Sequence, residues 1–427
     1  MQYITYPPVA TWPQITARPV VQSADLRQRV KPILNQVRDE GDAVLYRFTE
    51  QFDKVSLTSL QVTEAEIQEA ETLLPEALKA AIQAAKNNIF RFHKTQLQLP
   101  EPIETMPGVT CWRKSVAIDK VGLYIPGGTA PLFSTVLMLG IPAQIAGCRE
   151  IVLCTPANRE GKVHQAILYT AHLVGIHRIF KVGGAQAIAA MAYGTETIPK
   201  VYKIFGPGNQ YVTAAKQMVA QEGTAIDMPA GPSEVAVYTD DTANPAFVAA
   251  DLLSQAEHGT DSHVFLVSVS EKLITDVQEQ LTQQLQQLPR MEMAVQTLEH
   301  SKAILVRNEA EAIALLNQYA AEHLILATDR AEAIASQITN AGSVFLGHYT
   351  PEAAGDYASG TNHTLPTNGY ARAYSGVSVD SFVKKITFQQ ITPEGLRQVG
   401  PVVEQMAEAE ELTAHKNAVS IRLKSLP

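Results

Sequence analysis

Residues 254–259 offer two potential metal ligands at the end of an apolar helix. Residues 244–253 are apolar at helical spacing, and Gly259 follows His258 where a helix C-terminus would expose its last side chains. Gln255 and His258 therefore share one face. An imidazole nitrogen beside an amide oxygen is half of a mixed site that zinc or manganese accepts. The pair alone leaves the question open, because a histidine at a helix end is more often a capping or solvent-facing residue.

Glu322 and His323 are adjacent titratable residues where a helical segment, residues 309–321, gives way to a strand. At the end of a βα element they would be placed for general acid/base chemistry in a switch-point crevice. The alternative is a solvated glutamate and a half-buried histidine, because adjacent side chains diverge on regular elements. Asp356 lies on a long polar loop, residues 350–367, and such loops are usually functional.

Glycine turns follow three apolar strands, at residues 126–128, 183–184 and 206–209. Each can cradle a phosphate at a helix N-terminus, or can simply be a tight turn that needs glycine. The third comes nearest to a dinucleotide fingerprint, but Tyr211 stands where its last glycine should be. The occurrence of these turns on several strands of one unit favours a nucleotide ligand.

Apolar strands alternate with amphipathic helices from about residue 116 onward, which predicts parallel sheets covered on both faces. The predicted strands fall into two groups: residues 120–124, 151–154, 179–182 and 201–205, and then 234–238, 263–267, 323–327 and 343–346. Helical segments precede the first group, and a capping box at residues 63–66 opens one that runs to about residue 93.

Composition narrows the possible partners. The chain has 427 residues and a net charge of -9, with no extended basic run, so a nucleic acid partner is not expected. No stretch reaches the ~18 apolar residues of a membrane span, and the N-terminus lacks a signal-peptide pattern. The three cysteines include no C-x-x-C pair. We therefore expect a cytoplasmic protein without membrane contact.

Several strings, in this order along the chain, resemble those of the histidinol dehydrogenase family, from about residue 120 to the end. They are Leu123-Tyr-Ile-Pro-Gly-Gly, Val182-Gly-Gly-Ala-Gln-Ala-Ile, Phe205-Gly-Pro-Gly-Asn, Met228-Pro-Ala-Gly-Pro-Ser-Glu, Ser254-Gln-Ala-Glu-His-Gly, Ala321-Glu-His-Leu, Ala354-Gly-Asp-Tyr-Ala-Ser-Gly-Thr-Asn-His and Thr413-Ala-His-Lys-Asn-Ala. The resemblance implies a zinc-dependent, NAD-linked oxidation of L-histidinol through histidinaldehyde to L-histidine, the last steps of histidine biosynthesis. It also implies a homodimer with one zinc ion per subunit.

The resemblance assigns roles residue by residue. Glu322 and His323 become the acid/base pair. The remaining roles are metal ligands (Gln255, His258, Asp356 and His415), NAD contacts (Tyr124, Gln186 and Asn209) and substrate contacts (Ser233, Glu410, His323 and the four metal ligands). His323 suits the base of the alcohol step, and Glu322 suits the base for water in the aldehyde step, because no cysteine has an evident activating neighbour.

The expected fold is α/β, with two Rossmann-like parallel-sheet units and small appended segments at both ends. Its parts are an N-terminal arm (1–22), a larger α/β domain with the metal and acid/base residues (23–119 with 235–377), an NAD-binding domain (120–234) and a C-terminal module that crosses to the partner subunit (378–427). Two other classes of protein use part of this set of candidate residues. A metal-dependent hydrolase needs no nucleotide, and a nucleotide-binding sensor needs no turnover.

Overall fold

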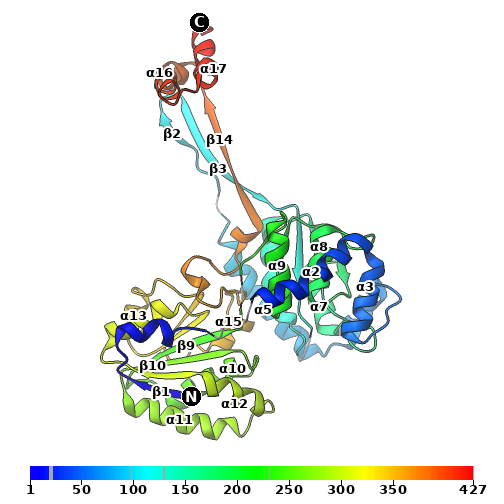
Figure 1. The fold of residues 1–427 in the computed structure, drawn as a ribbon, viewed down its shortest axis with the longest axis vertical. Helices are drawn as coiled ribbons and strands as arrows, with labels where there is room; N and C mark the ends of the chain where they lie inside the picture. The colour runs from blue at the N-terminus through cyan, green and yellow to red at the C-terminus, as the bar shows by residue number, and fades with distance from the viewer. Residues whose placement is uncertain (19–22, 98, 128–129, 230, 427) are drawn as a thin grey trace.

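The computed structural model describes residues 1–18, 23–97, 99–127, 130–229 and 231–426. Two parallel sheets with their helices form the body of the molecule, and a slender arm rises from it (Figure 1). The predicted fold class, α/β with two Rossmann-like units and appended segments, is confirmed. Gly128, in the first predicted glycine turn, lies outside the described residues. No helix of the described ranges is both long and apolar enough to cross a membrane.

The smaller sheet is parallel and has five strands in the order β6-β5-β4-β7-β8. The strands are β4 (Lys120–Tyr124), β5 (Glu150–Cys154), β6 (Arg178–Phe180), β7 (Lys203–Phe205) and β8 (Ala225–Ile226). Helices α6 (Phe133–Ala146), α7 (Gln165–Leu173), α8 (Gly184–Tyr193) and α9 (Gln210–Gln221) connect them. All four strands expected here are present. The strand order reverses between β4 and β7, which makes their carboxyl ends the switch point of this sheet.

The N-terminal helices pack on this smaller sheet. They are α2 (Ser23–Glu40), α3 (Asp42–Phe48), α4 (Glu64–Leu73) and α5 (Glu76–Lys94), and the predicted capping box of Thr63 and Glu66 opens α4. Helix α2 contacts α8 and α9, α4 contacts α7, and α5 contacts α6. Residues 23–94 therefore belong with the five-stranded sheet, whereas the sequence analysis grouped them with the larger unit. Their apolar faces precede both sheets in the chain, and periodicity does not say which sheet they cover.

The larger sheet is also parallel, in the order β1-β11-β10-β9-β12-β13. Its strands are β1 (Gln2–Thr5), β9 (Glu234–Thr239), β10 (His263–Ser268), β11 (Lys302–Leu305), β12 (His323–Ala327) and β13 (Ser343–Leu346). Helices α10 (Pro245–Ala256), α11 (Glu271–Leu285), α12 (Met291–His300) and α13 (Glu309–Tyr319) cover it. The first residues of the chain form its edge strand, and Trp12 is buried against the sheet.

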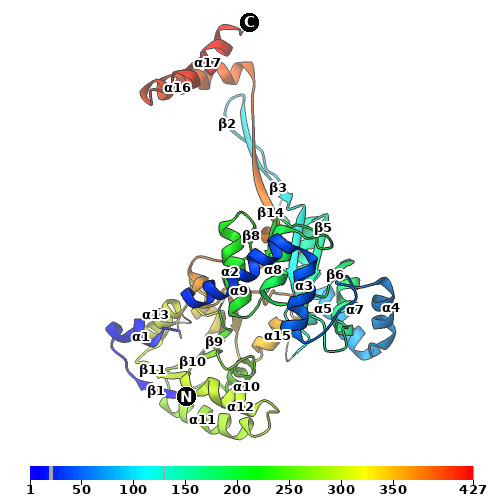
Figure 2. The same cartoon turned by 45° about the vertical axis from the view of Figure 1, so that its right-hand side comes forward.

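The arm combines segments that are far apart in sequence. Strand β14 (Val383–Ile391) pairs antiparallel with β3 (Val109–Ala117), which also pairs with β2 (Ile103–Met106). Helices α16 (Pro393–Ala409) and α17 (Thr413–Lys424) lie at its tip, away from both sheets in both views (Figures 1 and 2). The C-terminal module thus includes residues 103–117, which the sequence analysis placed in the larger domain. Antiparallel partners separated by more than 260 residues leave no local signal of their pairing.

Candidate active site

The predicted acid/base residues lie at the amino edge of the larger sheet. His323 is the first residue of β12, and Glu234 is the first residue of the neighbouring strand β9. The sequence predicts a crevice at a switch point, which in parallel sheets lies at the carboxyl ends of the strands. The structure instead brings the amino edge of the larger sheet toward the smaller unit. His363 joins the two, because its Nε2 lies 3.0 Å from Oγ1 of Thr135 on α6.

Three potential metal ligands meet beside His323. Ligand atoms of His258, Glu352 and Asp356 all lie within 4.8 Å of one another. His258 follows the end of α10, while Glu352 and Asp356 lie on the short helix α15 (Glu352–Tyr357). Burial lowers the pKa of His258, which favours the neutral imidazole that a metal needs. Glu352 is not among the residues predicted from sequence. Its spacing of four residues from Asp356 was the available signal, had the loop been recognised as a helix.

Gln255 has an unusual environment for an amide. Its side chain is 0% exposed, and neither its amide oxygen nor its amide nitrogen has a hydrogen-bond partner. Buried polar groups are nearly always paired, and an orphaned one costs about 1–3 kcal/mol. Gln255 lies in the last turn of α10, three residues before His258. An amide oxygen, an imidazole nitrogen and carboxylate oxygens form a donor set that fits zinc or manganese.

His323 is surrounded by carboxylates. Its Nδ1 lies 3.7 Å from oxygens of Glu322 and of Glu352, and its Nε2 lies 3.5 Å from Oδ1 of Asp356. Burial lowers the pKa of His323, but the charges of Glu352, Glu322 and Asp356 outweigh it and raise the pKa to about 10. This differs from the near-neutral base expected from sequence. A divalent cation at Asp356 would offset the negative charge and lower that pKa again.

Glu322 is buried and held in place by its neighbour strand. Its Oε2 accepts a 2.9 Å hydrogen bond from the backbone N–H of Glu234. Burial raises the pKa of Glu322 to about 7, while the charge of His323 lowers it. A carboxyl group that titrates near neutral pH can act as a general base. Ser233, the predicted substrate contact, directly precedes Glu234 and accepts a backbone hydrogen bond from His263.

The predicted nucleotide contacts gather at the carboxyl edge of the smaller sheet. The hydroxyl of Tyr124, at the end of β4, accepts a 3.0 Å hydrogen bond from the N–H of Gly184. Gln186 is buried in the first turn of α8. The Oδ1 atom of Asn209 accepts from the N–H groups of Tyr211 and Val212 and so caps α9. That cap leaves the amide nitrogen of Asn209 as the group that can donate to a ligand.

Two glycines in these turns are required by close packing. A Cβ on Gly206, whose φ is +128°, would lie 2.1 Å from the carbonyl oxygen of Tyr124. A Cβ on Gly183 would lie 2.7 Å from the Cβ of Pro156. The turns after β6 and β7 therefore pack closely against neighbouring backbone and ring atoms, with no room for a side chain at these two glycines. This close approach matches what a phosphate-binding edge needs, and it equally matches tight turns.

Glu410 and His415 lie on the arm and do not join the other site residues within one chain. Glu410 follows α16, and His415 lies in the first turn of α17. No residue of α17 is buried. Figures 1 and 2 show this helix far from α15, the helix that carries Asp356. The structure therefore brings His258, Asp356, Glu322 and His323 together and places Gln255 in the last turn of α10, three residues before His258. The other two predicted residues, Glu410 and His415, lie on the arm.

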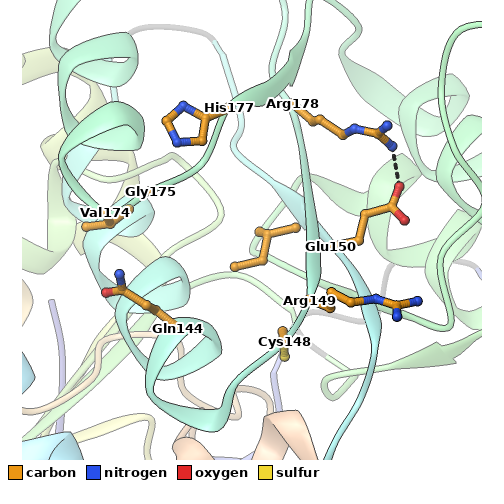
Figure 3. A pocket seen from close by; sticks show the side chains of 9 residues that line it. Gln144, Cys148, Arg149, Glu150, Val174, Gly175, His177 and Arg178 are labelled. Carbon is orange, nitrogen blue, oxygen red and sulfur yellow. Dashed lines mark hydrogen bonds and ion pairs between the residues drawn. The ribbon is translucent and has the colours of Figure 1, made fainter.

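The cysteines lie apart from the metal and acid/base residues, although Cys154 is the strand neighbour of Tyr124 in the smaller sheet. Burial raises the pKa of the Cys148 thiol to about 12 and raises that of Cys154 as well, while Cys111 belongs to strand β3 of the arm. Cys148 lines a pocket of about 430 Å³ at the amino edge of the smaller sheet (Figure 3). Arg178 and Glu150, which form an ion pair, both line that pocket. It lies at the opposite edge from the glycine turns.

Comparisons with known proteins indicate one family over nearly the whole chain. A family model described as histidinol dehydrogenase matches residues 16–423. The chain is 60% identical over 426 residues to histidinol dehydrogenase of Bacteroides thetaiotaomicron, covering 100% of both chains. A crystal structure of histidinol dehydrogenase from Elizabethkingia anophelis has a TM-score of 0.98 at 56% identity, covering 100% of this chain and 98% of that one. An acetylating aldehyde dehydrogenase from Geobacillus thermoglucosidasius, with a TM-score of 0.50 at 15% identity over 89% of this chain and 93% of that one, is similar in fold alone.

Proposed function

The chain belongs to the histidinol dehydrogenase family of histidine biosynthesis, and on that premise we propose that it oxidises L-histidinol through L-histidinaldehyde to L-histidine with zinc and NAD. Four electrons leave the substrate in two hydride transfers. The observation that carries the proposal is a set of ligand-type side chains: Gln255 in the last turn of α10, and His258 and Asp356 beside the buried Glu322 and His323. The side-chain amide of Gln255 has no hydrogen-bond partner, and a bound ligand would supply one.

We assign the metal site to Gln255, His258 and Asp356, completed by His415 of the partner subunit. Bound zinc would hold the imidazole and amino nitrogens of the substrate and keep its carbinol carbon in place, without changing its own oxidation state. Because zinc does not accept electrons, they pass to NAD, which Tyr124, Gln186 and Asn209 hold at the carboxyl edge of the smaller sheet (assignment by resemblance). The substrate also contacts Ser233, just before β9.

His323 acts as the base of the first oxidation. It takes the hydroxyl proton of histidinol while hydride leaves the carbinol carbon for NAD. The imidazole must be neutral for this task, and the carboxylates of Glu352 and Asp356 oppose that by raising its pKa. A cation bound at Asp356 would offset part of this negative charge, which would couple the protonation of His323 to occupancy of the metal site.

Glu322 acts as the base of the second oxidation. It takes a proton from the water that adds to the aldehyde carbon, and the resulting monoanion of the hydrate releases hydride to a second NAD and one proton to give the carboxylate product. Its pKa of about 7, set by burial, leaves a useful fraction ionised at neutral pH. The raised thiol pKa values of the half-buried Cys148 and the buried Cys154 support water rather than a thiolate as the nucleophile.

A homodimer with shared sites accounts for the arm. Large apolar side chains are exposed on it, including Ile103, Met406 and Ile421, each more than 60% exposed. A two-helix tip of this size cannot bury a core of its own, and exposed apolar surface of this kind marks an interface. We propose that the arm crosses to a second copy of the chain, where Glu410 and His415 of the partner subunit contact the substrate and metal.

Incubation of the zinc-loaded protein with L-histidinol and NAD tests the activity. We expect two NADH per histidinol consumed, followed by near-ultraviolet absorbance, with L-histidine as the product found by chromatography. A metal-dependent hydrolase or a nucleotide sensor would form no NADH. One NADH with accumulating aldehyde would contradict the four-electron assignment.

A further inference from the structure

A buried ion pair lies beneath the loop that follows β7. The Nζ atom of Lys216 on α9 is 2.5 Å from Oδ1 of Asp227, which follows β8, and the two side chains are 5% and 2% exposed. The same Nζ donates to the carbonyl oxygen of Gly206 at 2.8 Å. The N–H of Gly206 in turn donates to Oδ2 of Asp227 at 2.9 Å. Both backbone groups of Gly206 are therefore held by one ion pair.

Gly206, the residue that this ion pair holds, lies close to two of the predicted NAD contacts. Gly206 comes directly after β7, at the switch point of the smaller sheet, and its Cα packs against the backbone of Tyr124. Three residues later Asn209 caps α9. Ligands of such sheets bind in the crevice at this point. A shift of Gly206 would move both Tyr124 and Asn209 relative to that crevice.

Asp227 also begins the connection between the two sheets. Its Oδ1 accepts from the N–H of Met228 at 2.7 Å, and its backbone N–H donates to the carbonyl oxygen of Ile204 on β7 at 3.0 Å. The chain then continues to Ser233 and into β9. The ion pair is thus tied to the nucleotide-side loop and to the segment that leads to the substrate-side residue.

We propose that Lys216 and Asp227 are positioning residues for NAD: their buried ion pair fixes the Gly206 loop against Tyr124 at the switch point without touching the cofactor. This inference rests on the proposed use of NAD. A buried ion pair is a poor source of stability compared with apolar packing, and breaking it leaves an uncompensated charge. Here the ion pair fixes the positions of the N–H and C=O groups of Gly206, which a pair of apolar side chains could not do.

The chain offers a matched control. Lys181 and Glu66 form another largely buried ion pair of 2.6 Å in the same unit, with side chains 10% and 20% exposed. That pair joins β6's end to α4 and has no contact with the Gly206 loop. The Lys181→Met variant therefore loses a comparable charge pair without disturbing the switch point.

The experiment measures binding of NAD and of histidinol separately, by calorimetric titration of the zinc-loaded dimer. For Lys216→Met we expect Kd for NAD to rise about 10-fold or more, because small misplacements of binding groups are costly. Kd for histidinol should stay within about twofold, and Lys181→Met should change neither constant by more than that. In turnover, KM for NAD should rise in Lys216→Met while kcat at saturating NAD changes less.

Several outcomes would decide against the proposal. An unchanged Kd for NAD in Lys216→Met, or an equal rise in Lys181→Met, would remove the positioning role. If Lys216→Met does not fold, Asp227→Asn decides, because it keeps the shape and removes the charge; the same rise in Kd for NAD is expected, and its absence refutes the role. If the unaltered protein binds no NAD but binds histidinol, the proposed function itself fails, which the titration shows before any variant is made.

Discussion

The backbone N–H of Glu234 donates a 2.9 Å hydrogen bond to Oε2 of Glu322. This bond links the first residue of β9 to the residue just before β12, so two neighbouring strands orient one carboxylate. The side chain of Glu234 is itself held by Arg18, whose guanidinium makes two hydrogen bonds of 2.8 Å to it. Glu322 is thus positioned from the backbone and keeps one oxygen, Oε1, for chemistry.

Replacing this carboxylate should separate the two half-reactions. Glu322→Gln keeps the shape and an acceptor for the N–H of Glu234, but removes the base. We expect histidinaldehyde oxidation to slow by ~10²- to 10⁴-fold, and histidinol oxidation by much less. Each step is measured alone, by supplying histidinol or histidinaldehyde with NAD under single-turnover conditions. Equal slowing of both steps would show a shared role.

The pH dependence of the aldehyde step follows from the pKa of Glu322. Burial raises it from 4.5 to about 7, and only the ionised form accepts a proton. The rate should therefore fall about tenfold per pH unit below that pKa and level off above it. In Glu322→Gln this limb should disappear from the residual activity. A limb that persists in the variant would assign it to another group.

Cysteine chemistry should be dispensable. Replacing Cys111, Cys148 and Cys154 together by Ala or Ser should leave aldehyde oxidation within about threefold of the unaltered protein, since burial keeps two of these thiols protonated. Circular dichroism checks that the triple variant is folded. Loss of the aldehyde step alone, in a folded variant, would point to a thiolate nucleophile.

Glu352 should contribute to the metal site although the sequence analysis did not select it. Its ligand atoms lie within 4.8 Å of those of His258 and Asp356. We expect Glu352→Gln to weaken zinc binding by about 10- to 100-fold, as loss of a neighbouring carboxylate does in metal sites. Competition with a chromogenic chelator measures this directly. The control Glu332→Gln, at an exposed position on α14 (Ala331–Ala335), should leave affinity unchanged.

Mixing two inactive variants tests the shared site. In a mixed dimer of His323→Asn with His415→Ala, crossing arms place both lesions in one site and leave the other intact. Random pairing should then restore about a quarter of all sites. Mass spectrometry of the mixed dimers confirms subunit exchange. If exchange occurs and no activity returns, each chain uses its own His415.

Local patterns in the sequence were enough for eight of the eleven described strands of the two parallel sheets, for the capping box at Thr63 and for the motifs around His258 and His323. Burial on both faces makes such strands continuous apolar runs, which short windows reveal. The assignment to a family came from strings such as that around Gln255, and needed no geometry.

Only the tertiary structure determined which elements and residues pack against one another. The helices of residues 23–94 cover the smaller sheet, β3 pairs with β14 in the arm, and Glu352 joins the cluster around His323 at an amino rather than a carboxyl sheet edge. Each of these depends on contacts between residues far apart in the chain. Periodicity reports which face of an element is buried, but not which partner buries it, because any apolar surface satisfies the same pattern.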